Sequence, residues 1–284
     1  MGKKESVGTV YSYGLKVGME LLAHGRFTPA AKHLIIPVSY WRTVEFRLVL
    51  THGQFKPGER VLDIGSPKLI SLYLAKHAGV DVYATDIDRY FVDEYDSLRK
   101  WERLPDDRYH VDVQDGRKLT YQSGMFDKVF SISVLEHIPE DGDSECMREI
   151  GRVLAPGGRC LITVPFARVS QDQYRPAGDF YWSTSSQTND NGKVFFQRRY
   201  SEADLVDRLI IPSGLKLVQS RFVGERLFGK SDRELFEHLP PVTHPLLGPF
   251  QPVLSSIFHT PPVANTSELQ KPLCAFLELV KLTD

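Results

Sequence analysis

The stretch Val61–Ala75 reads VLDIGSPKLISLYLA, and it decides the fold. Its first part, VLDI, has the apolar character of a buried strand, and the part from Leu69 onward has a helical pattern. Gly65 lies between them and permits a tight turn with close backbone approach. Pro67 lacks an N–H and suits the first position of a helix. The stretch therefore predicts a strand, a ligand-binding loop and a helix.

Short apolar runs alternate with helical patterns in the residues that follow. The runs are VDVYATDID at 80–88, YHVDV at 109–113, FDKVFSISV at 126–134 and CLITV at 160–164. Strands joined by crossover helices predict βαβ units and a parallel sheet, and Val/Ile-rich strands are typical of a sheet covered on both faces. Further strands are expected at 215–222 and 275–280. The predicted fold is therefore a doubly wound α/β fold with a mostly parallel seven-stranded sheet and helices on both faces.

The chain before this alternating region predicts a helical cap. Two amphipathic helices, Tyr11–His24 and Ser39–His52, are expected, with Ser39 as N-cap and Gly53 as the C-terminal stop of the second. We therefore divide the chain into an N-terminal helical cap, residues 1–57, and a main domain, residues 58–284.

Two inserts interrupt the second half of the main domain. The first, 166–200, predicts a hairpin whose tip at 187–192 joins the strands DFYW at 179–182 and KVFFQ at 193–197. A helix is expected after it at 202–210. The second insert, 224–271, is rich in proline and too apolar for a disordered linker. We expect the inserts to form a lid over a substrate, and the second to offer a surface for a homo-oligomer.

Composition excludes several classes of function. The 36 acidic and 35 basic residues nearly cancel, so no whole-chain field attracts nucleic acid or an anionic membrane. No window approaches the roughly 20 apolar residues of a membrane span. The isolated Cys146, Cys160 and Cys274 fit neither a disulfide framework nor a CxxC metal site. These observations predict a cytoplasmic protein without a membrane span, a nucleic-acid partner or a bound metal.

The loop at Gly65 selects among ligands. A dinucleotide pyrophosphate needs the backbone N–H groups and close approach that the glycines of G-x-G-x-x-G provide. This loop has a single glycine, a proline and, two residues before the glycine, Asp63, whose carboxylate would repel a pyrophosphate. A ligand with an ammonium group would instead be attracted.

Asp63-Ile64-Gly65-Ser66 resembles the first motif of the class I S-adenosylmethionine-dependent methyltransferases, which has an acidic residue and glycines at this position. The family usually shows two or three glycines there, and this chain keeps one. The segments VYATDID, VDVQDGRKL, FDKVFSISVLEHIP and LAPGGRCLITVP follow in the family's order, across 61–165. The resemblance implies the Rossmann-like fold of that family and S-adenosyl-L-methionine as cofactor.

The resemblance also implies site residues. Asp86 would accept hydrogen bonds from the ribose diol, with Asp88 as the alternative, and Asp115 would receive the adenine amino group, with Asp112 as the alternative. Arg42, in a helix expected to close over the cofactor, would face its carboxylate. The full set of implied cofactor-binding residues is Asp63, Ile64, Gly65, Ser66, Asp86, Ile87, Asp115, Gly116, Ser133 and Arg42.

Residues for the methyl acceptor are less closely determined by the sequence. His137 in VLEHIP is a candidate catalytic base, because histidine gains and loses a proton near neutral pH, and a structural role is its alternative. Arg198, Arg199 and Tyr200 either hold an anionic group of the acceptor or form a solvated basic edge. His238 and His244 lack the spacing of a metal site.

The predicted function is methyl transfer to a small-molecule acceptor, since large aromatic and proline-rich inserts suit the walls of an acceptor pocket. Two other classes remain open from the sequence. An NAD-linked oxidoreductase would share the βαβ start and Asp86. A non-catalytic Rossmann-like binding protein would explain the low glycine count.

Overall fold

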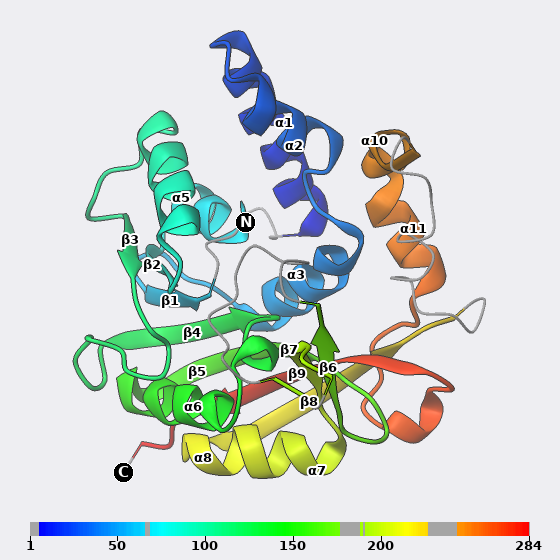
Figure 1. The fold of residues 1–284 in the computed structure, drawn as a ribbon. Coiled ribbons are helices and arrows are strands. Elements are labelled where there is room, and N and C mark those ends of the chain that lie inside the picture. The colour runs from blue at the N-terminus through cyan, green and yellow to red at the C-terminus, as the bar shows by residue number, and fades with distance from the viewer. Residues whose placement is uncertain (1–5, 66–68, 177–187, 190, 227–242, 284) are drawn as a thin grey trace.

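The structure is a computed structural model that describes residues 6–65, 69–176, 188–189, 191–226 and 243–283. Seven strands form one sheet in the order β3-β2-β1-β4-β5-β9-β8 (Figure 1). Their bounds are β1 Arg60–Ile64, β2 Asp81–Asp86, β3 Tyr109–Val113, β4 Phe126–Ile132, β5 Leu154–Pro165, β8 Lys216–Gly224 and β9 Pro272–Val280. The first five are parallel, and β9 is antiparallel to both of its neighbours. The predicted doubly wound, mostly parallel sheet is confirmed.

The strand order reverses at β1, which pairs with β2 on one side and with β4 on the other. Ile64 at the end of β1 is in register with Thr85 of β2 and Ser131 of β4, so the three strands end at one edge. The carboxyl edge of an open parallel sheet, at such a reversal, is where this class of fold binds ligands.

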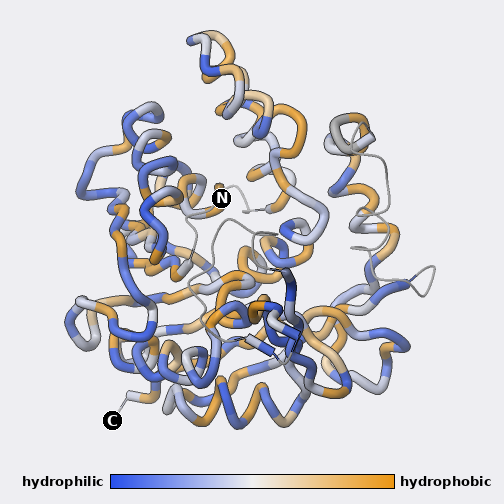
Figure 2. Tube along the Cα trace, in the orientation of Figure 1, coloured by the Kyte–Doolittle hydropathy of each residue, from blue (hydrophilic) through white to orange (hydrophobic). Residues whose placement is uncertain are grey.

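Helices cover both faces of the sheet, as expected. On one face, buried residues of α3 (Tyr40–Gly53) and α4 (Leu69–Tyr73) pack in one core with residues of β1, β2 and β4. On the other, α6 (Gly142–Val153) packs against β4 and β5 in a second core. Helix α5 (Arg89–Trp101) follows β2. Figure 2 shows hydrophobic segments along the sheet and mixed segments along the helices, which is the pattern of a double-sided core.

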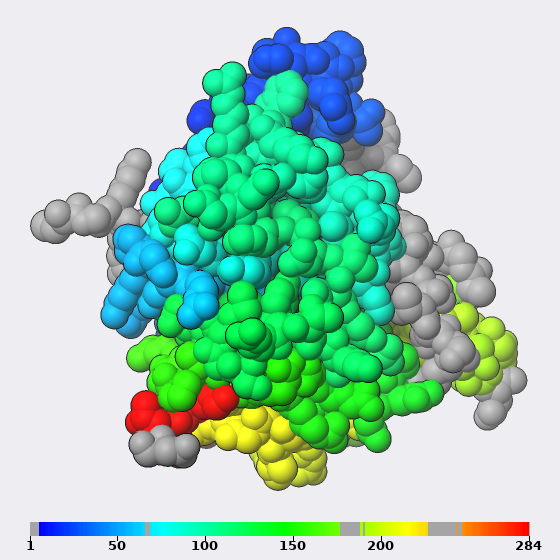
Figure 3. Space-filling view, turned by 90° about the vertical axis from the view of Figure 1, so that its left-hand side faces the viewer, coloured from blue at the N-terminus to red at the C-terminus, as the bar shows by residue number. Residues whose placement is uncertain are grey.

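The N-terminal region contains three helices where two were predicted. They are α1 (Val7–Ala23), α2 (Phe27–Ile35) and α3, and the first two project from the body of the molecule (Figures 1 and 3). The unpredicted α2 contains Pro29, which reads as a helix breaker, but this proline lies in the first turn, where its missing N–H breaks no helical bond. Ser39 is the N-cap residue of α3, whereas Gly53 belongs to the helix and Gln54 takes the left-handed conformation after it.

The first insert contains a two-stranded antiparallel sheet, β6 (Gln171–Arg175) with β7 (Val194–Arg199). The predicted strand KVFFQ falls largely in β7, whose partner among the described strands is β6. DFYW lies outside the described residues. Polar cross-strand pairs join the two strands: Arg198 Nε donates to Asp172 Oδ1 at 3.0 Å, and Gln197 Nε2 donates to Gln173 Oε1 at 2.7 Å. A polar strand such as β6 lacks the apolar alternation by which strands are recognised in a sequence.

The chain then forms a helical segment, α7 (Glu202–Asp204), a π-helical turn (Leu205–Ile210) and α8 (Ile211–Ser213), where one helix at 202–210 was predicted. In the second insert, α10 (His244–Leu247) and α11 (Gln251–Phe258) precede β9. Helix α11 packs on α3, where Gln251 Oε1 accepts a hydrogen bond from Tyr40 N at 2.8 Å. Within the described ranges, none of the helices has the length and apolar character that crossing a bilayer requires.

Candidate functional site

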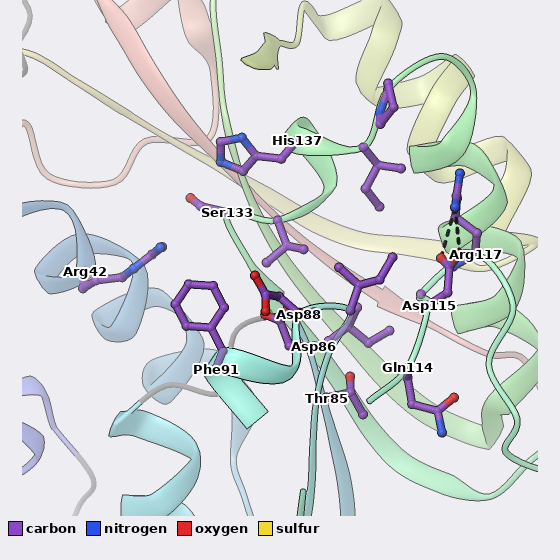
Figure 4. A pocket seen from close by; sticks show the side chains of 17 residues that line it. Arg42, Thr85, Asp86, Asp88, Phe91, Gln114, Asp115, Arg117, Ser133 and His137 are labelled. Carbon is purple, nitrogen blue, oxygen red and sulfur yellow. Dashed lines mark hydrogen bonds and ion pairs between the residues drawn. The ribbon is translucent and has the colours of Figure 1, made fainter. Parts of the chain in front are cut away.

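A cavity of about 370 Å³ opens at the carboxyl edge of the sheet, where the strand order reverses. Its walls come from the segments that follow β1, β2, β3 and β4, and from α3 (Figure 4). We call it the first cavity. Its lining residues are Arg42, Ile64, Gly65, Thr85, Asp86, Ile87, Asp88, Phe91, Gln114, Asp115, Gly116, Arg117, Ser133, Val134, His137, Ile138 and Pro139.

Gly65 is the glycine on which the β1 loop depends. Its φ of +112° lies in the region that favours glycine, and a Cβ added there would lie 2.2 Å from Val134 Cγ2. No other residue type fits this backbone against the chain that follows β4. The single glycine of the motif is thus at the position of closest approach between the two loops.

Asp63 is fully buried and is absent from the cavity's lining. Its backbone carbonyl accepts a hydrogen bond from Thr85 Oγ1 at 3.0 Å, which ties β1 to β2. A direct contact between Asp63 and a cofactor therefore stays a prediction, and Ser66 lies outside the described residues.

The two aspartates after β2 have different surroundings. Asp88 is the N-cap of α5, and its Oδ1 accepts a hydrogen bond from Tyr90 N at 2.9 Å. Asp86 is nearly buried, and its Oδ1 accepts from Asp88 N at 2.7 Å, which fixes the carboxylate in the cavity wall. Both aspartates line the cavity and each has one oxygen engaged by a backbone N–H, so the choice of Asp86 over Asp88 as the group that binds a ribose stays a prediction.

Asp115 and Gly116 follow β3 and line the opposite part of the cavity, with Asp115 paired to Arg117. Arg117 donates from Nη2 to Asp115 Oδ2 at 2.8 Å and from its backbone N to Oδ1 at 3.0 Å. Hydrogen bonds from Arg117 hold the pKa of the Asp115 carboxyl below its usual range. The alternative Asp112 accepts a hydrogen bond from Tyr121 Oη at 2.8 Å and does not line the cavity.

A charged pair, half-buried Arg42 and buried Glu45, lies where the first cavity adjoins a second one. Arg42 Nη1 lies 2.5 Å from Glu45 Oε2 and donates to Ile132 O at 3.3 Å. The other Glu45 oxygen accepts hydrogen bonds from Ser133 Oγ and Thr163 Oγ1. Desolvation opposes the charge of Arg42, but the carboxylates of Glu45, Glu136 and Asp63 outweigh it and raise the pKa of Arg42. Ser133 holds a φ of +50°, a backbone conformation that non-glycine residues rarely adopt.

The second cavity, of about 410 Å³, adjoins the first. Arg42, Ser133 and His137 line both. Its walls come from α3, the segment after β4, the end of β5, β9 and the β6–β7 pair. Its other lining residues are Ser39, Trp41, Glu45, Glu136, Pro165, Gln173, Phe196, Gln197, Arg199, Leu273 and Cys274.

His137 has a defined orientation between the two cavities. Its Nδ1 lies 2.7 Å from Phe196 O, and since a carbonyl oxygen only accepts, Nδ1 carries the proton. In the neutral imidazole, Nε2 then holds the lone pair, and it lies 3.8 Å from Glu136 Oε1. Glu136 is 1 % exposed. The arrangement suits a base whose protonated form faces a buried carboxylate.

Most of the site residues expected from the sequence lie together. Ile64, Gly65, Asp86, Ile87, Asp115, Gly116, Ser133 and Arg42 all line the first cavity. The sequence reasoning missed Thr85, Phe91, Arg117, Val134, Ile138 and Pro139, which line it as well. Each of these lies within a few residues of a strand end, so position after a strand was the available signal. His238 lies outside the described residues, and no group of three or more His, Cys, Asp or Glu side chains within the described ranges has the arrangement of a metal site.

The fold and the strand-end cavity agree with comparison to known families. Residues 62–162 match the family model described as a methyltransferase domain. This segment, less than half of the chain, is similar to that family's domain. The chain is 31 % identical over 121 residues to the methyltransferase GfsG of Streptomyces halstedii, and this alignment covers 42 % of this chain and 42 % of that protein. It is 28 % identical over 123 residues to phosphoethanolamine N-methyltransferase 2 of Caenorhabditis elegans, covering 42 % of this chain and 26 % of that protein.

The match thus spans less than half the length of these curated relatives. Among solved structures, the [4+2]-cyclase SpnF aligns with a TM-score of 0.58 at 17 % identity, covering 95 % of this chain and 97 % of that one. Geranyl diphosphate methyltransferase in complex with SAM aligns with a TM-score of 0.54 at 11 % identity, covering 85 % and 86 %. At such identities the likeness shows the fold of the methyltransferase domain with its additions, and it does not show the reaction.

Proposed function

We propose that this protein is an S-adenosylmethionine-dependent methyltransferase that transfers the methyl group in line to a small-molecule acceptor. The observation that supports this most directly is the pair of adjoining cavities at the carboxyl edge of the sheet, with Arg42, Ser133 and His137 lining both. A methyl transfer needs a donor and an acceptor held on either side of one reacting carbon. Two cavities with a shared wall provide that arrangement.

The first cavity has groups suited to S-adenosylmethionine. The Asp86 carboxylate would accept from the ribose hydroxyls, and Asp115 from the adenine amino group, with Phe91 and Ile138 as apolar walls. Buried carboxylates at Asp63, Glu45 and Glu136 favour a positively charged tail and oppose the two negative charges of an NAD pyrophosphate.

The second cavity would hold the acceptor. S-adenosylmethionine supplies an electrophilic methyl group when it is bound. For an acceptor with a hydroxyl group, His137 Nε2 takes the proton as the new bond to carbon forms, while Phe196 O keeps the ring in place through Nδ1. Glu136, 3.8 Å from Nε2, stabilises the resulting imidazolium. The first insert, which contributes Gln173, Phe196, Gln197 and Arg199, acts as one wall of the lid.

Calorimetry tests the donor half of the proposal. The full chain is titrated with S-adenosylhomocysteine and, separately, with NAD. Binding of the first alone supports the methyltransferase. Binding of NAD alone would indicate an oxidoreductase, and binding of neither by a folded sample would indicate a binding protein that has lost the cofactor.

Transfer of a radiolabelled methyl group tests the acceptor half. The protein is incubated with labelled S-adenosylmethionine and a cell extract separated by size. Label in the low-mass fraction supports a small-molecule acceptor, whereas label in the nucleic-acid or protein fraction contradicts it.

A further inference from the structure

Arg198 and Arg199 are adjacent on β7 but have opposite environments. Side chains alternate between the faces of a strand, so the two guanidinium groups point in opposite directions. Arg198 is 6 % exposed and pairs with Asp143 at 2.8 Å and Asp172 at 3.0 Å. Arg199 lies on the other face, where it lines the second cavity together with Gln197, two residues before it. Arg198 therefore has a structural role, and the role of Arg199 lies in the cavity.

The charge of Arg199 is little compensated by the described residues around it. Its Nη2 donates to Phe166 O at 3.0 Å, and no described carboxylate forms an ion pair with it. Desolvation lowers the pKa of Arg199, and no carboxylate of the described part of the chain offsets that effect, whereas Asp143 and Asp172 outweigh desolvation for Arg198. A half-buried guanidinium presents donors in a planar fork that matches an oxyanion.

The acidic residues of the same cavity are engaged elsewhere. Glu45 pairs with Arg42 and accepts from Ser133 and Thr163, and Glu136 lies beside His137. Both acids line the second cavity beside Arg42 and His137, with which they pair, so Arg199 is the cationic group of this cavity that has no carboxylate partner among the described residues. Gln173, which accepts from Gln197 through its oxygen, adds an amide NH₂ group near Arg199.

From this arrangement we propose that the second cavity contains an anion subsite, in which Arg199, with Gln173 beside it, binds a carboxylate or phosphate group of the methyl acceptor. The inference rests on the proposed methyltransferase function and adds the chemical class of its substrate. Phe196, whose carbonyl orients His137, lies three residues before Arg199, roughly 10 Å along a strand. The acceptor therefore carries its anionic group several bonds from the atom that is methylated, and Trp41 and Leu273 add apolar surface to the same cavity.

The test is a binding experiment on the full chain, with and without saturating S-adenosylhomocysteine. The probes are benzoate, phenyl phosphate and the neutral benzamide, which has the shape of benzoate. We expect wild type to bind at least one anionic probe about tenfold more tightly than benzamide, the ratio expected for one hydrogen-bonded charge. Preference for benzoate or for phenyl phosphate identifies the acceptor's group as a carboxylate or a phosphate.

Arg199→Gln is the test variant, and Arg168→Gln is its matched control. Arg168 also donates a hydrogen bond to a main-chain carbonyl, that of Leu269. It differs from Arg199 because it is exposed and does not line the second cavity. Arg199→Gln should remove the preference for the anionic probe and leave the affinity for S-adenosylhomocysteine unchanged, and Arg168→Gln should change neither. Should Arg199→Gln fail to fold, Arg199→Lys replaces it, and it should weaken anion binding without abolishing it because the charge remains but the planar fork is lost.

Equal binding of benzoate, phenyl phosphate and benzamide by wild type, no binding of any of them at millimolar concentration, or an unchanged preference in Arg199→Gln would overturn the subsite. A failure of the methyltransferase proposal is a separate result, since it appears as a lack of S-adenosylhomocysteine binding while the probe titrations without that ligand still report on Arg199.

Discussion

Gly65→Ala is the substitution that most directly tests the geometry of the cofactor loop. The alanine would have to adopt a φ of +112°, and its Cβ would lie 2.2 Å from Val134 Cγ2 and 2.9 Å from Cγ1. Positive φ costs a non-glycine residue roughly 1–2 kcal/mol, and overpacking costs about 1–3 kcal/mol. We therefore expect the free energy of unfolding to fall by roughly 2–5 kcal/mol.

Gly58→Ala separates the two contributions. Gly58 has a φ of +82°, and a Cβ there meets nothing within 4 Å, so only the backbone term of roughly 1–2 kcal/mol applies. The steric term is isolated by adding Val134→Ala to Gly65→Ala, because the truncation removes the two Cγ atoms of the clash. A double-mutant cycle should then give a favourable coupling of roughly 0.5–3 kcal/mol.

The assays are urea unfolding for stability and calorimetry for S-adenosylhomocysteine. Gly65 and Val134 both line the first cavity, so Gly65→Ala should also weaken cofactor binding by about tenfold or more, while Gly58→Ala leaves it unchanged. Equal destabilisation by the two alanine variants, together with wild-type affinity in Gly65→Ala, would refute the close approach of the two loops.

Three further predictions follow from the described contacts. Asp86→Ala should weaken S-adenosylhomocysteine binding by roughly 1.5–3 kcal/mol in calorimetry without lowering the melting temperature, and unchanged affinity would remove Asp86 from the site. Asp143→Ala should lower the free energy of unfolding by about 3–5 kcal/mol, because Arg198 and Arg208 lose the carboxylate that they share. Each guanidinium lies 2.8 Å from this fully buried carboxylate. A loss under about 1 kcal/mol contradicts this expectation. Burial lowers the pKa of His33 from 6.5 to about 4. Between these pH values the folded state binds fewer protons than the unfolded state, so the stability of the folded protein decreases as the pH falls from about 6.5 to about 4. Urea titrations across that range should show a smaller pH slope in His33→Gln than in wild type, and identical slopes would count against the assignment.

The sequence predicted the sheet well because strand and helix periods are local properties of the chain. The Val/Ile-rich runs around Val61, Val82, Val129 and Ile162 became neighbouring parallel strands, and the carboxyl ends of parallel strands meet at one edge. Asp86 and Asp115 consequently line one cavity, as expected from their positions after β2 and β3. Polar or proline-containing elements escaped recognition: α2 contains Pro29, and β6 is held by Asp172 and Gln173.

What the sequence determined by itself is therefore the doubly wound fold and the edge of the sheet where polar side chains gather, since both follow from periodicity along the chain. Tertiary structure decided which of those side chains face the cavities. It buried Asp63 outside the lining of the first cavity and used Asp88 as a helix cap, and it oriented His137 through Phe196, which lies 59 positions later. It also separated the neighbours Arg198 and Arg199 onto opposite faces of β7. Such contacts join residues far apart in the chain, so their geometry depends on how whole elements pack and has no counterpart in local sequence pattern.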